Sequence, residues 1–303
     1  MVDPTAPVAA CISTWTASDG YRSHYRAFIP PITPRANLVC LHGIQSHGGW
    51  YDYSSSRLCQ AGYAVYYLDR RGSGLNTEAR GDTPGAYQLL EDVREFIGQE
   101  RLATGTTPLV IMGCSWGGKL AAAFCTRYPT IAEGLVLLYP GIAAKVSPPP
   151  SQRLRILLAG RGRPKQSFPI PLNHPQLFTA EPRWQRFIAE DPLVLRQATA
   201  RFLLSSVWLD VLLRRRSASV RQPTLLLLSG RDQIIDNRRS RRRVRRLCRG
   251  FQRVIVYPEA QHTLEFEPDR DQFIDDTLRW LDLTANEMQW RRDRKLHAAP
   301  LAP

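Results

Sequence analysis

The residue of this chain best placed for nucleophilic chemistry is a serine inside a glycine-flanked pentapeptide. Ser115 is the central residue of the sequence GCSWG at 113–117, which follows the apolar run 109–112 and precedes the helix-forming stretch 119–124. At a sharp turn from strand to helix, a serine is held in strained backbone geometry with its hydroxyl exposed above the sheet edge. The pentapeptide alone would also fit an ordinary tight turn, so the prediction of a nucleophile depends on finding its partners.

Two loops downstream of Ser115 offer an acid and a base in the order that this chemistry requires. A serine hydroxyl is a weak nucleophile until an imidazole accepts its proton, and a carboxylate must orient that imidazole. Asp232 follows the buried-strand pattern 224–228, and His262 follows the strand pattern 253–257. Serine, acid and histidine in this order, each after a strand, are typical of the α/β-hydrolase arrangement. We predict Asp232 as the acid and His262 as the base.

Other residues compete for these two roles. Asp236 lies four residues after Asp232, in the same loop or at the start of the next helix, and is the alternative acid. We interpret His42 as a turn-stabilising side chain because it precedes the nucleophile strand. The remaining histidines, which we interpret as surface or structural residues, are His24, His47, His174 and His297.

A loop upstream of the nucleophile is the candidate oxyanion hole. The tetrahedral intermediate of acyl transfer carries negative charge on oxygen, and the loss of one preorganised N–H donor costs roughly 3 kcal/mol of barrier. The strand pattern 37–41 runs directly into the loop 42–47. We predict that the backbone amides of Ile44 and Trp116 donate to the oxyanion.

Together these motifs resemble the monoacylglycerol lipase and lysophospholipase branch of the α/β-hydrolases, also called the serine aminopeptidase-like hydrolases. The resemblance extends from about Ser13 to Leu283, and the residues that carry it are 42–44, His47, Tyr51, 69–74, 113–118, Asp232 and His262. It implies a serine esterase with no metal and no organic cofactor.

The sequence departs from the pattern of this branch at two positions. Ser73 stands where the family often has histidine, and Trp116 stands where it has a small or unbranched residue. We do not expect Ser73 to take part in the reaction. We expect the second to narrow the acyl pocket or to tilt the oxyanion donor.

The order of predicted elements indicates an α/β fold with a mostly parallel, doubly wound sheet. The segments 13–16 and 25–29, joined around Gly20, predict an opening antiparallel hairpin. Strand patterns then alternate with helical ones, which implies parallel strands with helices on both faces. Ligands on such sheets bind at the carboxyl ends of the strands, where all the candidate site residues have been placed.

The alternation stops in the middle of the chain, which predicts an insertion. We expect a hydrolase core over 1–140 and 222–287, a helical lid over 141–221 and a basic, weakly ordered tail over 288–303. Within the lid, 145–151 and 160–164 have the proline and glycine content of linkers. Apolar residues spaced from Leu193 to Leu212 predict a long amphipathic helix after them.

The chain is strongly basic, with a net charge of +14, and its arginines are densest over 237–253. We expect a helix there that docks an apolar stripe of Val244, Leu247, Cys248 and Phe251 and presents arginines to solvent. That face would attract anionic lipid head groups by about 1 kcal/mol per residue, unless it is only an ordinary solvated helix. We do not expect nucleic acid as a partner, because no nucleic-acid-binding motif accompanies the charge.

The remaining composition favours a cytoplasmic protein that is soluble or, at most, peripheral to a membrane. Residues 1–10 lack the pattern of a secretory signal, and the longest apolar runs are strand-sized. Six scattered cysteines without C-x-x-C spacing suit reduced thiols better than disulfides or a metal site.

These observations predict a serine hydrolase that cleaves a lipid-like carboxylic ester of the monoacylglycerol or lysophospholipid class. Three alternatives stay open. The acyl-enzyme could pass its acyl group to an acceptor other than water, the bond cleaved could be an amide, or the chain could be a non-catalytic, membrane-associated module on a hydrolase scaffold.

Overall fold

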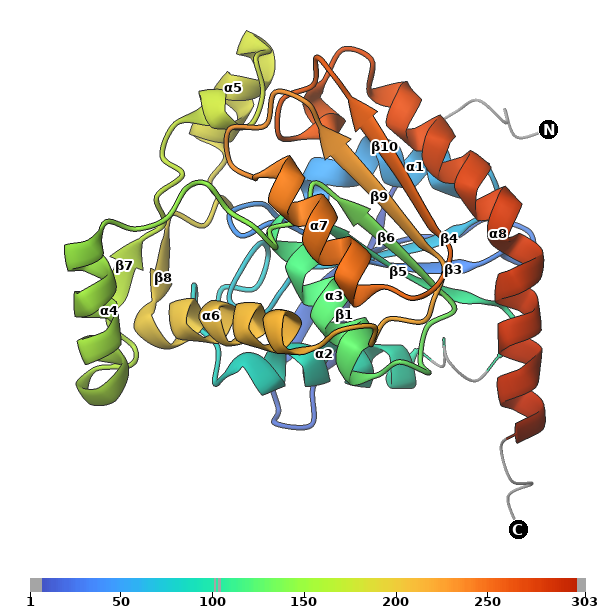
Figure 1. Cartoon of the computed structure of the whole chain (residues 1–303), viewed down its shortest axis with the longest axis horizontal. Helices are drawn as coiled ribbons and strands as arrows, with labels where there is room; N and C mark the ends of the chain where they lie inside the picture. Colours follow the sequence, from blue (N-terminus) through green and yellow to red (C-terminus); the bar gives the residue numbers. More distant parts are fainter. Residues whose placement is uncertain (1–6, 101, 103–104, 299–303) are drawn as a thin grey trace.

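The structure of the chain is a computed structural model that describes residues 7–100, 102 and 105–298. One eight-stranded sheet, with strand order β1-β2-β4-β3-β5-β6-β9-β10, forms its centre (Figure 1). The pairs β1–β2 and β2–β4 are antiparallel, and the other pairs are parallel. The strands are β1 (Cys11–Thr16), β2 (Arg22–Phe28), β3 (Asn37–Leu41), β4 (Ala64–Leu68), β5 (Leu109–Cys114), β6 (Gly134–Leu138), β9 (Thr224–Ser229) and β10 (Gln252–Tyr257). The predicted opening hairpin and mostly parallel sheet are confirmed.

Helices cover both faces of this sheet, which explains why its central strands are buried along their whole length. All residues of β3, β5, β6 and β9 are buried. Side chains alternate along a strand, so Ile111 of β5 packs with one core while Val110 and Met112 pack with the other. The helices of the main domain are α1 (Asp52–Gln60), α2 (Ala86–Gln99), α3 (Trp116–Arg127), α7 (Asn237–Leu247) and α8 (Arg270–Ala298).

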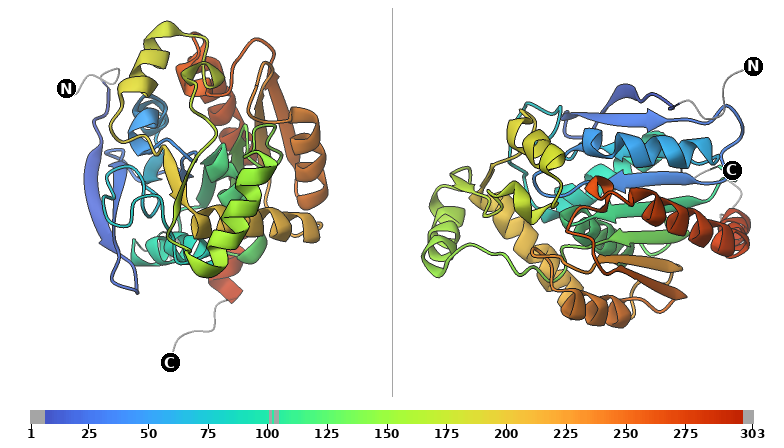
Figure 2. Two further views of the ribbon diagram at one scale, coloured as in Figure 1. Left: turned by 90° about the vertical axis from the view of Figure 1, so that its left-hand side faces the viewer. Right: turned by 90° about the horizontal axis from the view of Figure 1, so that it is seen from above.

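The segment between β6 and β9 forms a subdomain of its own. Its elements are α4 (Pro150–Gly162), β7 (Ser167–Pro169), α5 (Pro182–Glu190), β8 (Gln197–Thr199) and α6 (Ala200–Arg215). In Figures 1 and 2, α4, β7 and β8 lie together at one end of the molecule, beyond the sheet. α6 packs on α2 and α3 and so joins the insertion to the core.

Two expectations for the insertion were wrong in detail. The stretch 160–164 is not simply a linker, because α4 runs through Gly162. Proline at its first position favours this helix, since a proline there gives up no intrahelical hydrogen bond. The amphipathic helix begins at Ala200 rather than near Leu193, because Thr199 caps it by accepting the Phe202 N–H.

The expected basic tail from 288 was also wrong. α8 continues to Ala298, and Met288 and Arg292 are buried. The Arg292 guanidinium donates to the carbonyl oxygens of Leu102 and Thr107, which anchors this part of the helix to the core. The last residues of that expectation, 299–303, lie outside the described part of the chain.

The arginine-rich helix is shorter than the sequence suggested. α7 ends at Leu247, and the segment from Gln252 already belongs to β10. Val244, Leu247 and Cys248 are buried as expected, but Phe251 is 54% exposed and lies outside the stripe.

Candidate active site

Ser115 lies at the apex of the turn between β5 and α3. Its backbone has φ 50° and ψ −119°, a left-handed conformation that is strained for a residue with a side chain. The turn is fixed on both sides, since the Ser115 N–H donates to the carbonyl of Leu138 and its carbonyl accepts from Gly141. The predicted strand, sharp turn and helix are therefore present at this position.

Gly117 must be glycine because its backbone passes very close to the end of β3. A methyl group on Gly117 would overlap the carbonyl oxygens of Leu41 and His42. We expect Gly117→Ala to lower the free energy of unfolding by more than about 3 kcal/mol, because backbone atoms cannot move aside cheaply. Chemical denaturation measures this change.

Gly98→Ala is the matched control for that substitution. Gly98 is an exposed residue of α2 with open space around it. Alanine there should raise stability by up to about 1 kcal/mol, because it loses less conformational entropy on folding. Equal effects of the two substitutions would contradict the close approach at Gly117.

Three side chains from three loops form one hydrogen-bonded chain. His262 Nε2 lies 3.0 Å from Ser115 Oγ, and His262 Nδ1 lies 2.8 Å from Asp232 Oδ2. The Asp232 Oδ1 atom accepts the N–H groups of Ile234 and Ile235, each at 2.8 Å. The carboxylate is thus fixed from one side and can hold the imidazole from the other. This arrangement permits proton transfer from the serine hydroxyl to the imidazole.

The structure separates Asp232 from the alternative acid. Asp236 is the N-cap of α7, where its Oδ1 accepts the Arg239 N–H at 2.9 Å. His262 is buried and packs edge-on against the rings of Tyr139 and Phe178. Asp232, and not Asp236, contacts the imidazole.

The loop that carries Ile44 lies next to the nucleophile. A methyl group on Gly43 would be 3.5 Å from Ser115 Cβ, and Ile44 and Trp116 both line the cavity at Ser115. Within the described residues, no hydrogen bond uses the backbone N–H of Ile44 or of Trp116. Both amides are therefore available as donors to an oxyanion.

His42 supports this loop from inside the protein. Its Nδ1 donates to the Gly43 carbonyl and its Nε2 accepts the Arg70 N–H, at 2.8 and 2.9 Å. Burial, together with the positive charge of Arg70, lowers the pKa of His42 well below its usual value. A neutral imidazole with one donor and one acceptor fits these contacts. His42 thus stabilises the turn.

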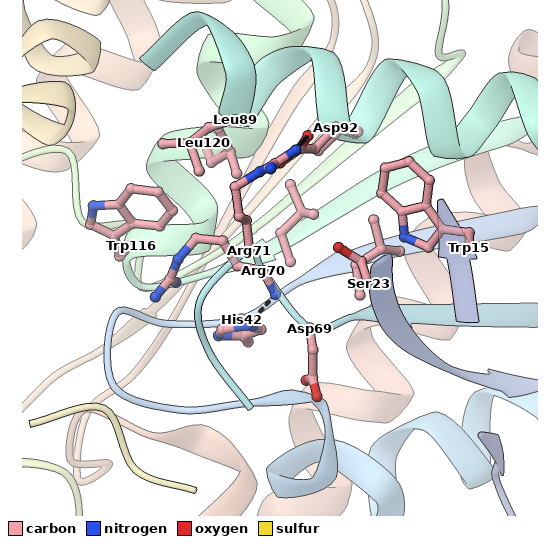
Figure 3. Close-up of a pocket in the computed structure, with 13 residues that line it drawn as sticks. Trp15, Ser23, His42, Asp69, Arg70, Arg71, Leu89, Asp92, Trp116 and Leu120 are labelled. Carbon is pink, nitrogen blue, oxygen red and sulfur yellow. Dashed lines mark hydrogen bonds and ion pairs between the residues drawn. The ribbon is translucent and has the colours of Figure 1, made fainter. Parts of the chain in front are cut away.

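Arg70 is a supporting residue whose contacts no local sequence pattern predicts. Figure 3 shows its guanidinium turned towards Trp116, while the neighbouring Arg71 points to Asp92. Arg70 donates to the carbonyls of Gly43 and Ile44, and its guanidinium carbon lies 4.7 Å from the Trp116 ring centre. Arg70 therefore connects the loop of Ile44 with the residue after the nucleophile.

The insertion is tied to the same loop by two sets of hydrogen bonds. The Leu195 N–H donates to the carbonyl of Gln45 at 2.9 Å. Asp191 Oδ2 accepts from His47 Nε2 at 2.9 Å and from Trp50 Nε1 at 2.7 Å. Burial of Asp191 acts against ionisation, but these hydrogen bonds lower its pKa overall. His47 is thus structural, as expected, and the insertion is fastened close to Ile44.

A cavity of about 730 Å³ opens beside Ser115, between the core and the insertion. Its apolar wall comes largely from α4, α6 and the segment after β7. The side chains of that wall are Ile156, Leu157, Ile170, Leu172, Leu203 and Leu204. A chain of methylene groups would bury apolar surface there, at about 0.8 kcal/mol per CH₂.

A buried carboxyl close to the site gives the protein a pH-dependent stability. Glu265 follows His262 by three residues, is 2% exposed and accepts the Ser54 N–H at 3.0 Å. Burial raises the pKa of Glu265 from 4.5 to about 7. The folded protein therefore holds a proton that the unfolded chain releases between these pH values, so stability falls as pH rises through that range.

Glu265→Gln should remove this dependence, because the glutamine does not ionise. The difference in free energy of unfolding between the variant and the wild type should therefore be up to about 3 kcal/mol more favourable to the variant at pH 8 than at pH 4.5. Urea denaturation at several pH values measures it, with the exposed Glu78→Gln as the control. A difference between Glu265→Gln and wild type that stays constant with pH would contradict the raised pKa.

The described part of the chain contains neither a metal-binding cluster nor a membrane-spanning helix. Residues 7–100, 102 and 105–298 contain no group of three or more His, Cys, Asp or Glu side chains that could hold a metal ion. None of their helices is both long enough and apolar enough to cross a bilayer.

The chain is similar to hydrolases over most of its length. The model of the family described as serine aminopeptidase, S33 matches residues 32–269. A monoacylglycerol lipase of Mycolicibacterium smegmatis is 28% identical over 268 residues, which are 86% of this chain and 93% of the relative.

Solved structures of hydrolases share the fold. A monoacylglycerol lipase of Paleococcus ferrophilus has a TM-score of 0.78 at 22% identity and covers 88% of this chain and 99% of its own. A soluble variant of monoglyceride lipase from Saccharomyces cerevisiae, in complex with a substrate analogue, has a TM-score of 0.80 at 17% identity. It covers 92% of this chain and 96% of its own. These similarities confirm the predicted α/β-hydrolase fold.

Proposed function

Because the chain belongs to the serine aminopeptidase S33 family of α/β-hydrolases, we propose that it is a serine hydrolase that cleaves a lipid-like carboxylic ester through an acyl-enzyme. The substrate class is monoacylglycerol or lysophospholipid. The observation that carries the proposal is the hydrogen-bonded chain of Ser115, His262 and Asp232 at the wall of a largely apolar cavity. The M. smegmatis relative, a monoacylglycerol lipase, supports the substrate class.

In the first half of the reaction, Ser115 Oγ attacks the ester carbonyl carbon while His262 Nε2 takes the hydroxyl proton. Asp232 stabilises the imidazolium that forms. The carbonyl oxygen becomes an oxyanion, and the amides of Ile44 and Trp116 donate to it. The tetrahedral intermediate collapses, His262 returns the proton to the leaving alkoxide, and the alcohol departs from an acyl-Ser115 ester.

In the second half, a water molecule takes the place of the alcohol. His262 accepts a proton from the water, whose oxygen attacks the acyl carbonyl. Collapse of the second intermediate returns the proton to Ser115 Oγ and releases the carboxylic acid. We propose that residues 141–221 act as a lid that limits the access of bulk water during these steps.

Covalent labelling tests the mechanism, and a panel of esters tests the substrate class. A fluorophosphonate probe should modify the wild type on Ser115, as peptide mass spectrometry of the labelled protein would show. Monoacylglycerols and lysophospholipids of several chain lengths should be hydrolysed faster than short-chain esters such as acetates. An adduct on another residue would refute the nucleophile, and a preference for acetates would refute the lipid class.

Two catalytic alternatives differ in the second half-reaction or in the bond cleaved. If the acyl group passes to an alcohol, the protein is an acyltransferase, and product analysis in the presence of a competing alcohol would show the new ester. A panel of amide substrates would in the same way reveal a peptidase. A non-catalytic module would bind liposomes in a salt-sensitive way and show no esterase turnover.

Peripheral contact with anionic membranes stays a separate proposal for α7. The exposed residues Arg238, Arg242 and Arg246 follow one another at i, i+4 spacing along this helix. Such a row would attract anionic head groups by about 1 kcal/mol per residue. Replacing all three by glutamine should reduce co-sedimentation with phosphatidylserine vesicles at low salt. Unchanged co-sedimentation would refute the contact.

A further inference from the structure

The cavity beside Ser115 carries a cluster of positive charge at its polar side. Five of its lining residues are cationic and one is a carboxylate, Asp210. The cations come from four helices, α3, α4, α6 and α7. They are Lys119, Arg153, Arg214, Arg239 and Arg243.

Lys119 forms the innermost part of this cluster, one helical turn from Ser115. Its side chain is 7% exposed, and Nζ lies 2.9 Å from Asp210 and 3.2 Å from Ser206 Oγ. Burial, with Arg243 and Arg214 nearby, lowers the pKa of Lys119, while Asp210 acts to raise it. The nearby arginines are thus close enough for their charges to affect this ammonium group.

Two arginines of α7 face the cavity rather than solvent alone. Arg239 and Arg243 are one helical turn apart and both line it. The Arg243 guanidinium donates to the carbonyl of Ile142, one residue after Gly141, whose N–H binds the Ser115 carbonyl. Part of the arginine-rich sequence therefore belongs to the wall of the substrate cavity.

The positive charge of this wall is only partly balanced. Asp210 pairs with Lys119, and Asp236 lies 3.3 Å from Arg239. Within the part of the chain that the structure describes, Arg153, Arg214 and Arg243 form no ion pair with a carboxylate. Clustered charges of one sign in a cleft focus the field and attract a ligand of the opposite sign.

We propose that this cluster binds an anionic group of the ester substrate, so that the enzyme selects anionic lipid esters over neutral ones. The proposal rests on the proposed esterase function and specifies its substrate. The apolar wall takes the hydrocarbon part, and the cationic wall takes a phosphate or carboxylate through charge-assisted hydrogen bonds. A neutral glycerol head group gives these arginines nothing to neutralise.

Substrate pairs that differ only in charge test the selectivity. One pair is 1-octanoylglycerol and its 3-phosphate, with the charge on the alcohol side. The other is methyl octanoate and the monomethyl ester of octanedioic acid, with the charge on the acyl side. All are used below the concentrations at which they aggregate, so that surface attraction does not contribute. The wild type should favour the anionic member of at least one pair by about tenfold in kcat/KM, and the pair that responds shows on which side the charge is bound.

The double variant Arg239→Gln/Arg243→Gln should reduce that preference about tenfold, because it removes two of the five cations. The matched control is Arg241→Gln/Arg245→Gln, which removes the same charge at the same spacing from exposed positions of α7 outside the cavity lining. It should keep the wild-type preference. If loss of the Ile142 contact unfolds the double variant, Arg214→Gln on the separate helix α6 takes its place in the test. This substitution should also reduce the preference for the anionic substrate.

Two results would overturn the proposal: no preference for charge in either pair, or an equal loss in the cavity variants and in the control. Neither result affects the esterase function, which stands as long as the neutral esters are hydrolysed. If no ester is hydrolysed, that function fails, and calorimetry still tests the cluster. Ser115→Ala should then bind 1-octanoylglycerol 3-phosphate about tenfold more tightly than its Arg239→Gln/Arg243→Gln derivative does, and equal affinities would overturn the proposal.

Discussion

Ser115→Ala is expected to lower kcat for ester hydrolysis by about a millionfold, because it removes the atom that forms the acyl-enzyme. The substitution should leave the free energy of unfolding almost unchanged. Ser115 Oγ has His262 as its hydrogen-bond partner, and the backbone bonds that fix the turn do not involve the side chain. Steady-state kinetics with the best ester of the panel, together with urea denaturation, measures both quantities.

A buried serine outside the site provides the control. Ser55 lies in α1, and Ser55→Ala should keep the wild-type kcat. Cys114 adjoins Ser115, but its thiol is buried 2.9 Å from the Tyr67 hydroxyl and its raised pKa, caused by burial, keeps it protonated. It cannot readily replace the serine. If Ser115→Ala retained a tenth of the wild-type turnover, the nucleophile would have to be another residue.

Asp232→Asn is expected to lower kcat about ten-thousandfold without disturbing the geometry of the site. The reason lies in the two N–H groups of Ile234 and Ile235, which point at Oδ1. An asparagine must present its carbonyl oxygen to them, so its NH₂ group faces His262 Nδ1. That donor selects the imidazole tautomer with the proton on Nε2, which cannot accept the proton of Ser115.

Asp236→Asn is the matched control, since it makes the same chemical change four residues away. Asparagine is as good an N-cap as aspartate, so α7 should keep its first turn and the protein its stability. The variant should hydrolyse the best ester at the wild-type rate. If Asp236→Asn lost activity and Asp232→Asn kept it, the acid in the proposed mechanism would be Asp236.

The sequence predicted the parts of the site that depend on strand ends. Parallel strands in one sheet have their carboxyl ends at one edge, so the loops after β3, β5, β9 and β10 had to meet there. This is why Ser115, Asp232 and His262 could be expected to approach one another. The choice between Asp232 and Asp236 followed from distance to the strand end, and the structure gives the physical reason, because Asp236 is occupied as a helix cap.

Features that depend on contacts between distant segments could not be predicted in this way. Nothing in the local pattern around Arg70 shows that its guanidinium reaches the carbonyls of the Ile44 loop. Likewise, periodicity shows which side of α7 is apolar, but it does not show that Arg239 and Arg243 face a cavity built by other helices. The end of α8 was missed because Arg292 is a charged residue that becomes buried by donating to backbone carbonyls.

The hydrogen bonds from the insertion to Gln45 and His47 have a consequence for engineering this enzyme. The insertion, which we propose to act as a lid, binds the backbone one residue from Ile44, whose amide we propose as a donor to the oxyanion. Exchanging that segment for one from a relative would therefore disturb turnover as well as substrate preference. Redesign of specificity should keep Asp191 and Leu195 in place and confine its changes to side chains that face the hydrocarbon.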